Sequence, residues 1–125
     1  MSVERDAIQV LYQRGWTKGV VCDQDGSVCM NGALAIAVGI DITQGDERVY
    51  GDLERDVPEV LERVCSVLHE QFPERVEREA DERAWVTQPM TVFRFNDYCS
   101  PVDETQFADV VAVLEKAAVL AEERV

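Results

Sequence analysis

Apolar residues recur at helical spacing in several stretches of the chain. Over residues 3–14 they fall three and four positions apart on one face, which is the pattern of an amphipathic helix. Ser2 precedes this stretch and can cap its N-terminus with its hydroxyl. Gly15 follows it and can end the helix, because glycine tolerates the left-handed conformation that closes the last turn. The same spacing returns over residues 58–72 behind Pro58, a residue that fits the first turn of a helix. We therefore predict helices over both stretches.

Two further helices are predicted from different signals. Residues 29–39 are apolar on almost every side, which is typical of a helix buried in the centre of a protein. Ser27 is its expected cap. Nearer the C-terminus, Asp103–Gln106 resembles a capping box with Asp in place of Ser or Thr. Apolar residues at helical spacing follow it from Phe107 to Ala121, so we predict the last helix there.

The segments between these helices carry weaker patterns. Residues 16–28 contain the turn sequence Asp23–Gly26, and short extended segments on either side of it would form a small hairpin. Residues 40–56 are rich in Asp, Glu and Gly, and we predict a loop with at most a short turn of helix. Residues 73–84 carry charges of both signs and suit either an exposed helix or a solvated linker. Residues 90–95 alternate in part and favour a short strand or an extended segment.

These patterns together predict a mainly α fold in a single domain over residues 1–125. A length of 125 residues suits one hydrophobic core, and no repeat or Gly/Ser-rich linker divides the chain. The simplest arrangement is a bundle of about four helices around the buried second one, with a minor hairpin or strand pair beside it.

The chain is strongly acidic, with a net charge of −13. Residues 46–83 alone hold 13 acidic and 6 basic residues. Because such a surface repels phosphate backbones, we expect no direct nucleic-acid binding. A basic protein partner, or mimicry of nucleic acid by this stretch, fits the charge, although acidic surfaces most often serve solubility alone. No apolar run approaches the ~20 residues of a membrane span and no signal peptide is visible, so we expect a cytoplasmic protein that does not bind membranes.

The four cysteines are expected to be free thiols in a cytoplasmic chain. They are Cys22, Cys29, Cys65 and Cys99. Cys29 stands at the start of the predicted second helix, where backbone N–H groups and the helix dipole lower the pKa of a thiol. A cysteine hydrolase also needs a base, and the single histidine is His69; Asn96 or Asp97 would orient it. Because residue types alone do not assemble such a site, catalysis by Cys29 is an alternative rather than the main hypothesis.

A metal site is a second chemical alternative. Cys65 and His69 are four positions apart on the predicted third helix, a spacing that lets both side chains reach one ion. Cys22, Cys29 and Cys99 would complete a tetrahedral set, but the ligands are scattered and no Cys-x-x-Cys pair is present. We therefore interpret the cysteines as core residues and His69 as a surface or packing side chain, and we expect no cofactor.

Short motifs along the chain match a known pattern. They are Gly15-Trp16-Thr17 with Gly19, Cys29 to Leu34 with Ala37, and Phe95-Asn96-Asp97 ahead of the last helix. Together they resemble a family of small actinobacterial and actinobacteriophage proteins of unknown function. The resemblance leaves out residues 46–84 and implies a phage or actinobacterial origin, but it supplies no catalytic residues because the family has no assigned activity. The family's recurring positions are Trp16, Cys29, Gly32, Asn96 and Asp97.

The motif residues Asn96 and Asp97 suit a tight bend, in which both side chains accept backbone N–H bonds. Asn96 would bond to residues 16–28 across the core, and Asp97 would cap the entry to the last helix. Trp16 would be a buried anchor whose indole N–H needs a partner. We prefer this structural interpretation to a binding role for Trp16, Asn96 and Asp97, because buried polar groups are paired in any fold.

The leading functional hypothesis is a non-enzymatic protein-interaction or regulatory module that binds a protein partner through its acidic surface. The charge, the small size and the lack of an assembled catalytic set favour this hypothesis. The alternatives are a hydrolase built on Cys29 and a nucleic-acid mimic built on residues 46–83. A self-associating structural role also stays open.

Overall fold

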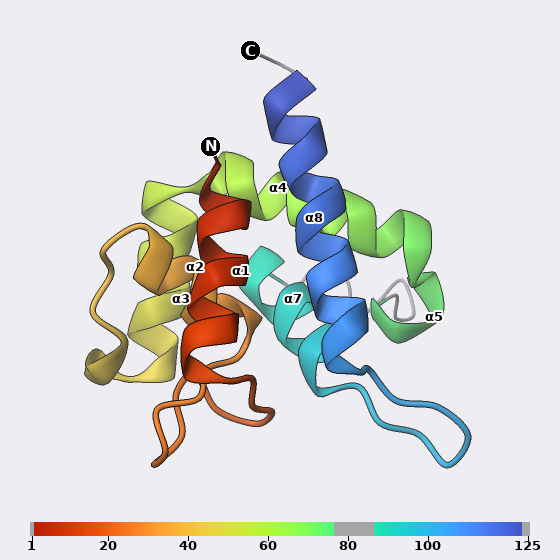
Figure 1. The fold of residues 1–125 in the computed structure, drawn as a ribbon, viewed down its shortest axis with the longest axis horizontal. Helices are drawn as coiled ribbons and strands as arrows, with labels where there is room; N and C mark the ends of the chain where they lie inside the picture. The colour runs from red at the N-terminus through yellow and green to blue at the C-terminus, as the bar shows by residue number, and fades with distance from the viewer. Residues whose placement is uncertain (1, 77–86, 124–125) are drawn as a thin grey trace.

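The computed structural model describes residues 2–76 and 87–123. Seven α-helices and one short 3-10 helix form most of this part of the chain (Figure 1). In chain order they are α1 (Val3–Arg14), α2 (Met30–Ala37), η1 (Ile42–Gln44), α3 (Asp46–Asp56), α4 (Pro58–Gln71), α5 (Pro73–Val76), α7 (Gln88–Asp97) and α8 (Phe107–Glu123). The described residues include isolated bridges but no strand. A mainly α fold is therefore confirmed, whereas the hairpin is not.

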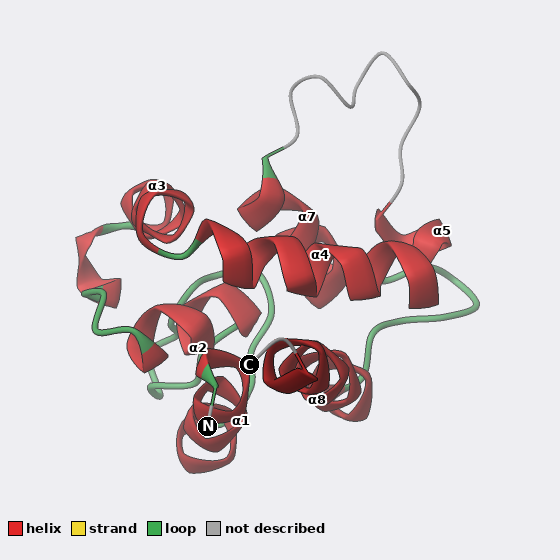
Figure 2. Cartoon of the chain, turned by 90° about the horizontal axis from the view of Figure 1, so that it is seen from above, coloured by secondary structure: helices red, strands yellow, loops and turns green. Residues whose placement is uncertain are grey.

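The helix α2 lies at the centre of the described fold. It packs against α1, α3 and α7, and its residues from Met30 to Ala35 are all buried. α8 packs against α1 and α4 instead. Figure 2 shows α4 running across the molecule, with α1, α3 and α8 seen nearly end-on around it. A buried second helix is confirmed, but a bundle of about four helices is too simple a description of this arrangement.

The helix α1 begins and ends as the sequence predicts. The Ser2 hydroxyl accepts a hydrogen bond from the Arg5 N–H at 3.3 Å, and Gly15 has a φ of 94°, a value that favours glycine. α1 lies antiparallel to α8 (Figure 1), and the Arg5 guanidinium binds the Glu122 carboxylate at 2.6 Å. α4 likewise begins at Pro58, as predicted.

Residues 40–56 are not the predicted loop. η1 is capped by Asp41, whose carboxylate accepts a hydrogen bond from the Thr43 N–H at 2.9 Å, and α3 follows directly. Val49 and Leu53, four positions apart, are fully buried and give α3 a narrow apolar face. The loop prediction is wrong because this face is only two side chains wide and stands in an otherwise acidic sequence.

Residues 90–95 form no strand and belong to α7. Val92 and Phe95 are fully buried on this helix, and Pro89 lies in its first turn. β-Branched and aromatic residues favour strands only where the surrounding packing agrees. Here α2, α3, α4 and α5 all pack against α7, so tertiary contacts override the local preference.

The turn at Asp23–Gly26 forms as predicted. The Asp23 carboxylate accepts hydrogen bonds from the N–H groups of Asp25 and Ser27 at 2.9 and 3.0 Å, which is how Asp stabilises a tight turn. Ser27 does not cap α2, because Cys29 occupies the capping position. α2 is accordingly shorter than the predicted helix.

The helix α8 begins at Phe107 without the predicted capping box. The Asp103 carboxylate binds the Arg75 guanidinium at 2.6 Å instead, and the Gln106 N–H donates to the Asp109 carboxylate at 2.9 Å. Arg75 also pairs with Asp109 at 3.2 Å. Ion pairs from Arg75 of α5, together with the local bond between Gln106 and Asp109, therefore fix the start of α8.

Residues 73–84 begin as a helix, since α5 spans Pro73–Val76 and buries Val76. The choice between an exposed helix and a linker for residues 77–84 lies outside the described residues. Among the helices that the structure describes, none combines the length and the apolar character needed to cross a membrane.

We expect Asp103 to make stability depend on pH. Its hydrogen bond to Arg75 holds the pKa of the Asp103 carboxyl below its usual range. Such a group adds stability that is present above the unfolded pKa of about 3.9 and is lost as the pH falls through the folded pKa. Asp103→Asn should therefore lower Tm at neutral pH, and the difference from the wild type should shrink in acid. Thermal unfolding at both pH values tests this; an unchanged difference would contradict it.

Candidate functional site

Asn96, at the end of α7, is the centre of a buried polar network. Its side chain is fully buried. Its Oδ1 accepts hydrogen bonds from the Trp16 indole N–H at 2.6 Å and from the Met30 backbone N–H at 3.1 Å. Its Nδ2 donates to the Thr17 carbonyl at 3.1 Å and to the Asp97 carboxylate at 2.9 Å. One side chain thus joins α7, the first turn of α2 and the loop after α1, and all of its hydrogen-bonding capacity is used.

Asp97 binds the loop after α1 at Gly19. Both of its carboxylate oxygens accept from the Gly19 N–H at 3.0 Å. The predicted role of Asp97 at the entry to the last helix is wrong, because α8 begins only at Phe107. The predicted bond from Asn96 to residues 16–28 is present. The two side chains therefore fix this loop against α7.

Trp16 is a partly buried anchor. Its ring stacks on Phe107 of α8 with the ring centroids 6.1 Å apart. The Lys18 ammonium lies 5.4 Å from the centroid of the Trp16 ring, within the range of a cation–π contact. Because its indole N–H donates to Asn96, the polar atom of this side chain is occupied within the protein.

Cys29 is a buried helix cap. The side chain is 2% exposed, and its Sγ accepts a hydrogen bond from the Gly32 N–H at 3.4 Å. Burial raises the pKa of the Cys29 thiol to about 11, although hydrogen bonds from the first turn of α2 act in the opposite direction. The position at a helix start is as predicted, but desolvation outweighs the effect of the helix N-terminus on the thiolate.

The remaining candidate residues do not join this network. His69 is exposed on α4 and belongs to none of the hydrogen bonds that bring Trp16, Asn96 and Asp97 together. Cys65 is buried, its thiol donates to the Gln88 carbonyl at 3.5 Å, and burial raises its pKa to about 12. The structure therefore brings Asn96 to the start of α2 beside Cys29 but leaves His69, the third member of the predicted Cys–His–Asn set, outside this network.

All four cysteines are free thiols, as predicted. Two of them, Cys29 and Cys65, are buried, whereas Cys22 is half-buried and Cys99 is exposed. Within residues 2–76 and 87–123, no group of three or more His, Cys, Asp or Glu side chains is arranged to hold a metal ion. The predicted pair of Cys65 and His69 thus gains no further ligand in this part of the chain.

Gly32 shows why a small residue stands in the first turn of α2. A Cβ atom at this position would lie 2.5 Å from the Val21 carbonyl oxygen and 3.0 Å from Cβ of Val28. Both neighbours belong to the loop that Asn96 and Asp97 hold in place, so neither is the free end of a long side chain. The loop and α2 can approach this closely only because glycine lacks a side chain.

We expect Gly32→Ala to lower the free energy of unfolding by about 1–3 kcal/mol, because the backbone must shift to admit the methyl group. Gly51→Ala is the matched control. Gly51 lies inside α3, and an added Cβ would meet nothing within 4 Å, so this variant should gain about 0.5–1 kcal/mol. Urea unfolding of the two variants measures both effects; equal effects would contradict the close approach at Gly32.

Two buried polar contacts of the structure were not predicted from the sequence. Glu4 is fully buried and binds Arg63 of α4 at 2.7 Å. A signal for this was present, since Glu4 falls three, four and seven positions before the apolar residues Ala7, Ile8 and Leu11 and thus on the same helical face. Asn31 is the second buried polar residue that was not predicted, and its side chain donates to the Pro89 carbonyl at 2.9 Å.

The fold and the network define a small helical protein whose polar motif residues bind one another across its core. The chain belongs to a family of unknown function, DUF6197, whose model matches residues 2–120. The match therefore includes the acidic helices α3 and α4, which the motif resemblance leaves out. Neither the curated proteins nor the solved structures contain a match to this chain.

Proposed function

We propose that the protein is a non-enzymatic interaction module that binds a basic protein partner through its acidic surface. The observation that carries this proposal is a surplus of exposed carboxylates over available cations on α3 and α4. The exposed acidic side chains of these helices are Glu47, Glu54, Asp56, Glu59, Glu62 and Glu70. Of the three arginines there, Arg55 is paired with Asp52 and Asp56, Arg63 binds the buried Glu4, and Arg48 is exposed. Lys116 of α8 pairs with Glu70, so the exposed carboxylates still outnumber the cations. The resulting negative field favours encounter with a positively charged protein.

The non-enzymatic part of the proposal is supported by the state of the motif residues. The side chains of Asn96 and Asp97 form hydrogen bonds with the loop after α1. The thiol of Cys29 is buried and has a pKa of about 11. A nucleophile needs an accessible thiolate and a base within hydrogen-bonding reach. The arrangement around Cys29 supports a structural role better than the alternative of a cysteine hydrolase.

We further propose an actinobacterial or phage source for the chain, as the motif resemblance implies, and a location in the bacterial cytoplasm. In that setting the acidic stretch 46–83 favours a second candidate function, mimicry of nucleic acid. The exposed carboxylates of α3 and α4 support it, because a basic protein that binds phosphates would also be attracted to them. The two functions differ in whether DNA competes for the partner.

The proposal is tested with the full-length chain immobilised in an actinobacterial lysate over a series of salt concentrations. We expect a basic protein to be retained at low salt and released as salt rises, because screening weakens contacts between exposed charges. The dissociation constant for that purified partner should then weaken steeply with salt. Competition by double-stranded DNA would identify a mimic. Absence of any partner at all salt concentrations, or an affinity that salt does not change, would contradict the proposal.

A further inference from the structure

We propose that the basic partner binds with one arginine side chain at the seam between α3 and α7, here defined by Asp46 and Tyr50 of α3 and by Phe93 and Asp97 of α7. The guanidinium of this arginine lies against the two rings and binds the two carboxylates. The inference rests on the proposed function, because it names the partner side chain that the acidic surface of α3 recognises.

The seam consists of an aromatic pair and a pair of carboxylates. The rings of Tyr50 and Phe93 are in contact, with their centroids 6.5 Å apart. Asp46 precedes Tyr50 by four positions, and Asp97 follows Phe93 by four positions. Each carboxylate therefore lies one helical turn from a ring, on the same face of its helix. All four residues are half-buried, so part of each stays open to a partner.

One short segment of the loop after α1 binds both carboxylates. The Gly19 N–H donates to Asp97 at 3.0 Å, and the Val21 N–H donates to Asp46 at 3.3 Å. These N–H groups are two residues apart along the chain, which limits their separation to roughly 7 Å. Burial raises the pKa of the Tyr50 hydroxyl, and the charges of Asp46 and Asp97 raise it further. Both charges therefore act on the same part of the seam.

Neither seam carboxylate is neutralised by a cation of the described chain. None of the ion pairs within residues 2–76 and 87–123 includes Asp46 or Asp97. Their hydrogen bonds come from neutral N–H groups. Because an ionised carboxylate accepts at up to about four sites, both can also bind a charged donor.

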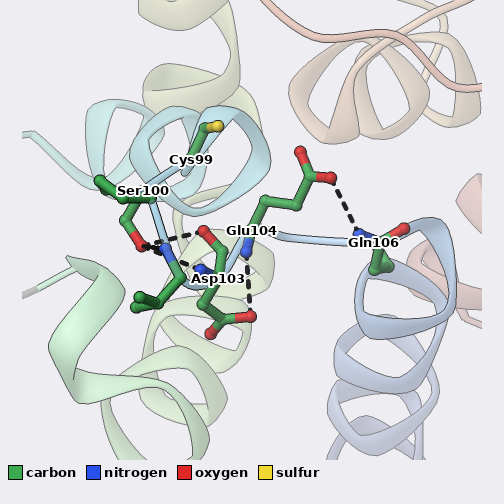
Figure 3. Close-up of a pocket in the computed structure, with 7 residues that line it drawn as sticks. Cys99, Ser100, Asp103, Glu104 and Gln106 are labelled. Carbon is green, nitrogen blue, oxygen red and sulfur yellow. Dashed lines mark hydrogen bonds between the residues drawn. The ribbon is translucent and has the colours of Figure 1, made fainter.

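The carboxylates in the open hollow beside residues 99–106 differ in this respect. This hollow of about 410 Å³ is lined by Asp103 and Glu104 among others (Figure 3). Asp103 pairs with Arg75 at 2.6 Å, and Glu104 pairs with Lys18 at 3.5 Å. Since these charges are already compensated, the seam suits a cationic side chain better than the hollow does.

Asn31 of α2 adds a buried acceptor that lacks a donor. Its side chain is fully buried and lies within hydrogen-bonding reach of the Tyr50 hydroxyl, while its Oδ1 has no partner. Buried polar atoms without partners are rare in native proteins, and each needs an explanation. Next to the two carboxylates, this oxygen makes the seam rich in acceptors and poor in donors.

An arginine side chain supplies what the seam lacks. A guanidinium carries a positive charge and several N–H donors but no acceptor. It is also planar, so it stacks on aromatic rings while its edge binds carboxylates. A lysine ammonium is a compact and strongly hydrated charge without a flat face. The combination of rings and carboxylates therefore favours arginine over lysine.

The seam is continuous with the acidic surface of α3. Glu47 precedes Tyr50 by three positions and Glu54 follows it by four, and both are exposed. Residues at these spacings are neighbours on one helical face. A partner anchored by an arginine at the seam thus brings its other basic residues to the exposed carboxylates of α3.

A titration of the full-length, isotope-labelled chain with the peptide acetyl-Gly-Arg-Gly-amide tests the inference by NMR. Two further peptides replace the arginine by lysine or by citrulline, which keeps the shape of arginine without its charge. The backbone amide signals of Gly19, Val21 and Tyr50 report binding at the seam. Dissociation constants are measured for the wild type, Asp46→Asn and Tyr50→Leu. The matched control is Glu59→Gln, which removes one exposed charge on α4, and thermal unfolding verifies that each variant is folded.

We expect the arginine peptide to shift these three signals and to bind at least about threefold more tightly than the lysine and citrulline peptides. Asp46→Asn and Tyr50→Leu should each weaken its binding at least about threefold, because they remove a charge and a ring. Glu59→Gln should bind as the wild type does.

Equal binding of the citrulline peptide, an affinity that both seam variants leave unchanged, or shifts confined to residues outside the seam would overturn the inference. The proposed function is then decided separately by the lysate experiment. A basic protein that is retained at low salt and released at high salt supports it even where the seam variants bind that protein normally.

Discussion

Arg63→Met is expected to lower the free energy of unfolding by about 3–5 kcal/mol, because it leaves a buried charge without its partner. The Glu4 carboxylate is fully buried and receives two hydrogen bonds from the Arg63 guanidinium, at 2.7 and 3.3 Å. The pair joins α1 to α4. Methionine fills much of the space of the arginine stem but donates no hydrogen bond to the carboxylate. Urea unfolding of the wild type and the variant measures the loss.

The double variant Glu4→Leu with Arg63→Met provides the internal control. It removes both charges together and should recover most of the lost stability, since apolar replacement of a buried ion pair is often neutral or stabilising. Arg55→Met removes an exposed pair with Asp56 and should leave the stability nearly unchanged, because solvent screens such a pair. A single Arg63→Met variant as stable as Arg55→Met would show that Glu4 is not buried as described.

Asn96→Ala is expected to cost about 2–4 kcal/mol, because several buried polar groups lose their partners at once. The Trp16 indole N–H and the Met30 N–H lose their acceptor, and the Thr17 carbonyl loses a donor. The effect should appear both in the urea midpoint and in near-ultraviolet circular dichroism, since the Trp16 ring is no longer fixed.

Asn31→Ala is the matched comparison, because it truncates the same type of buried side chain in the adjacent helix. The Asn31 amide donates to the Pro89 carbonyl, and its Oδ1 is buried without a partner. We expect this variant to cost about 1 kcal/mol, less than Asn96→Ala. If the two variants lose equal stability, the network around Asn96 adds nothing beyond an ordinary buried asparagine.

The sequence predicts those helices whose apolar residues form a wide stripe. α1, α4 and α8 belong to this class, and each has the expected spacing. The helix α3 could not be predicted in this way, because Val49 and Leu53 alone form its buried face. The helix α7 could not be predicted either, because Val92 and Phe95 favour a strand locally and become helical only through packing against the surrounding helices.

The meeting of Trp16 with Asn96 and Asp97 follows from the sequence motifs and from the need to pair buried polar groups. The protonation state of the Cys29 thiol does not follow from the sequence motifs. Its position at the start of α2 predicts a lowered thiol pKa, but burial, which depends on the whole fold, raises it. The motifs do indicate that His69 stands apart, because their pattern leaves out residues 46–84, and His69 is indeed exposed on α4.

The central claim is that the motif residues form the framework of the protein rather than a catalytic site. Residue-resolved mass spectrometry of thiol alkylation in the native chain tests it most directly, with Cys29→Ser to verify the assignment. With a pKa of about 11, the Cys29 thiol is ionised in only about one molecule in 10,000 at pH 7. We expect Cys99 to react as an ordinary exposed thiol and Cys29 to react only on unfolding. Alkylation of Cys29 in the folded protein as fast as that of Cys99, or faster, would contradict the claim.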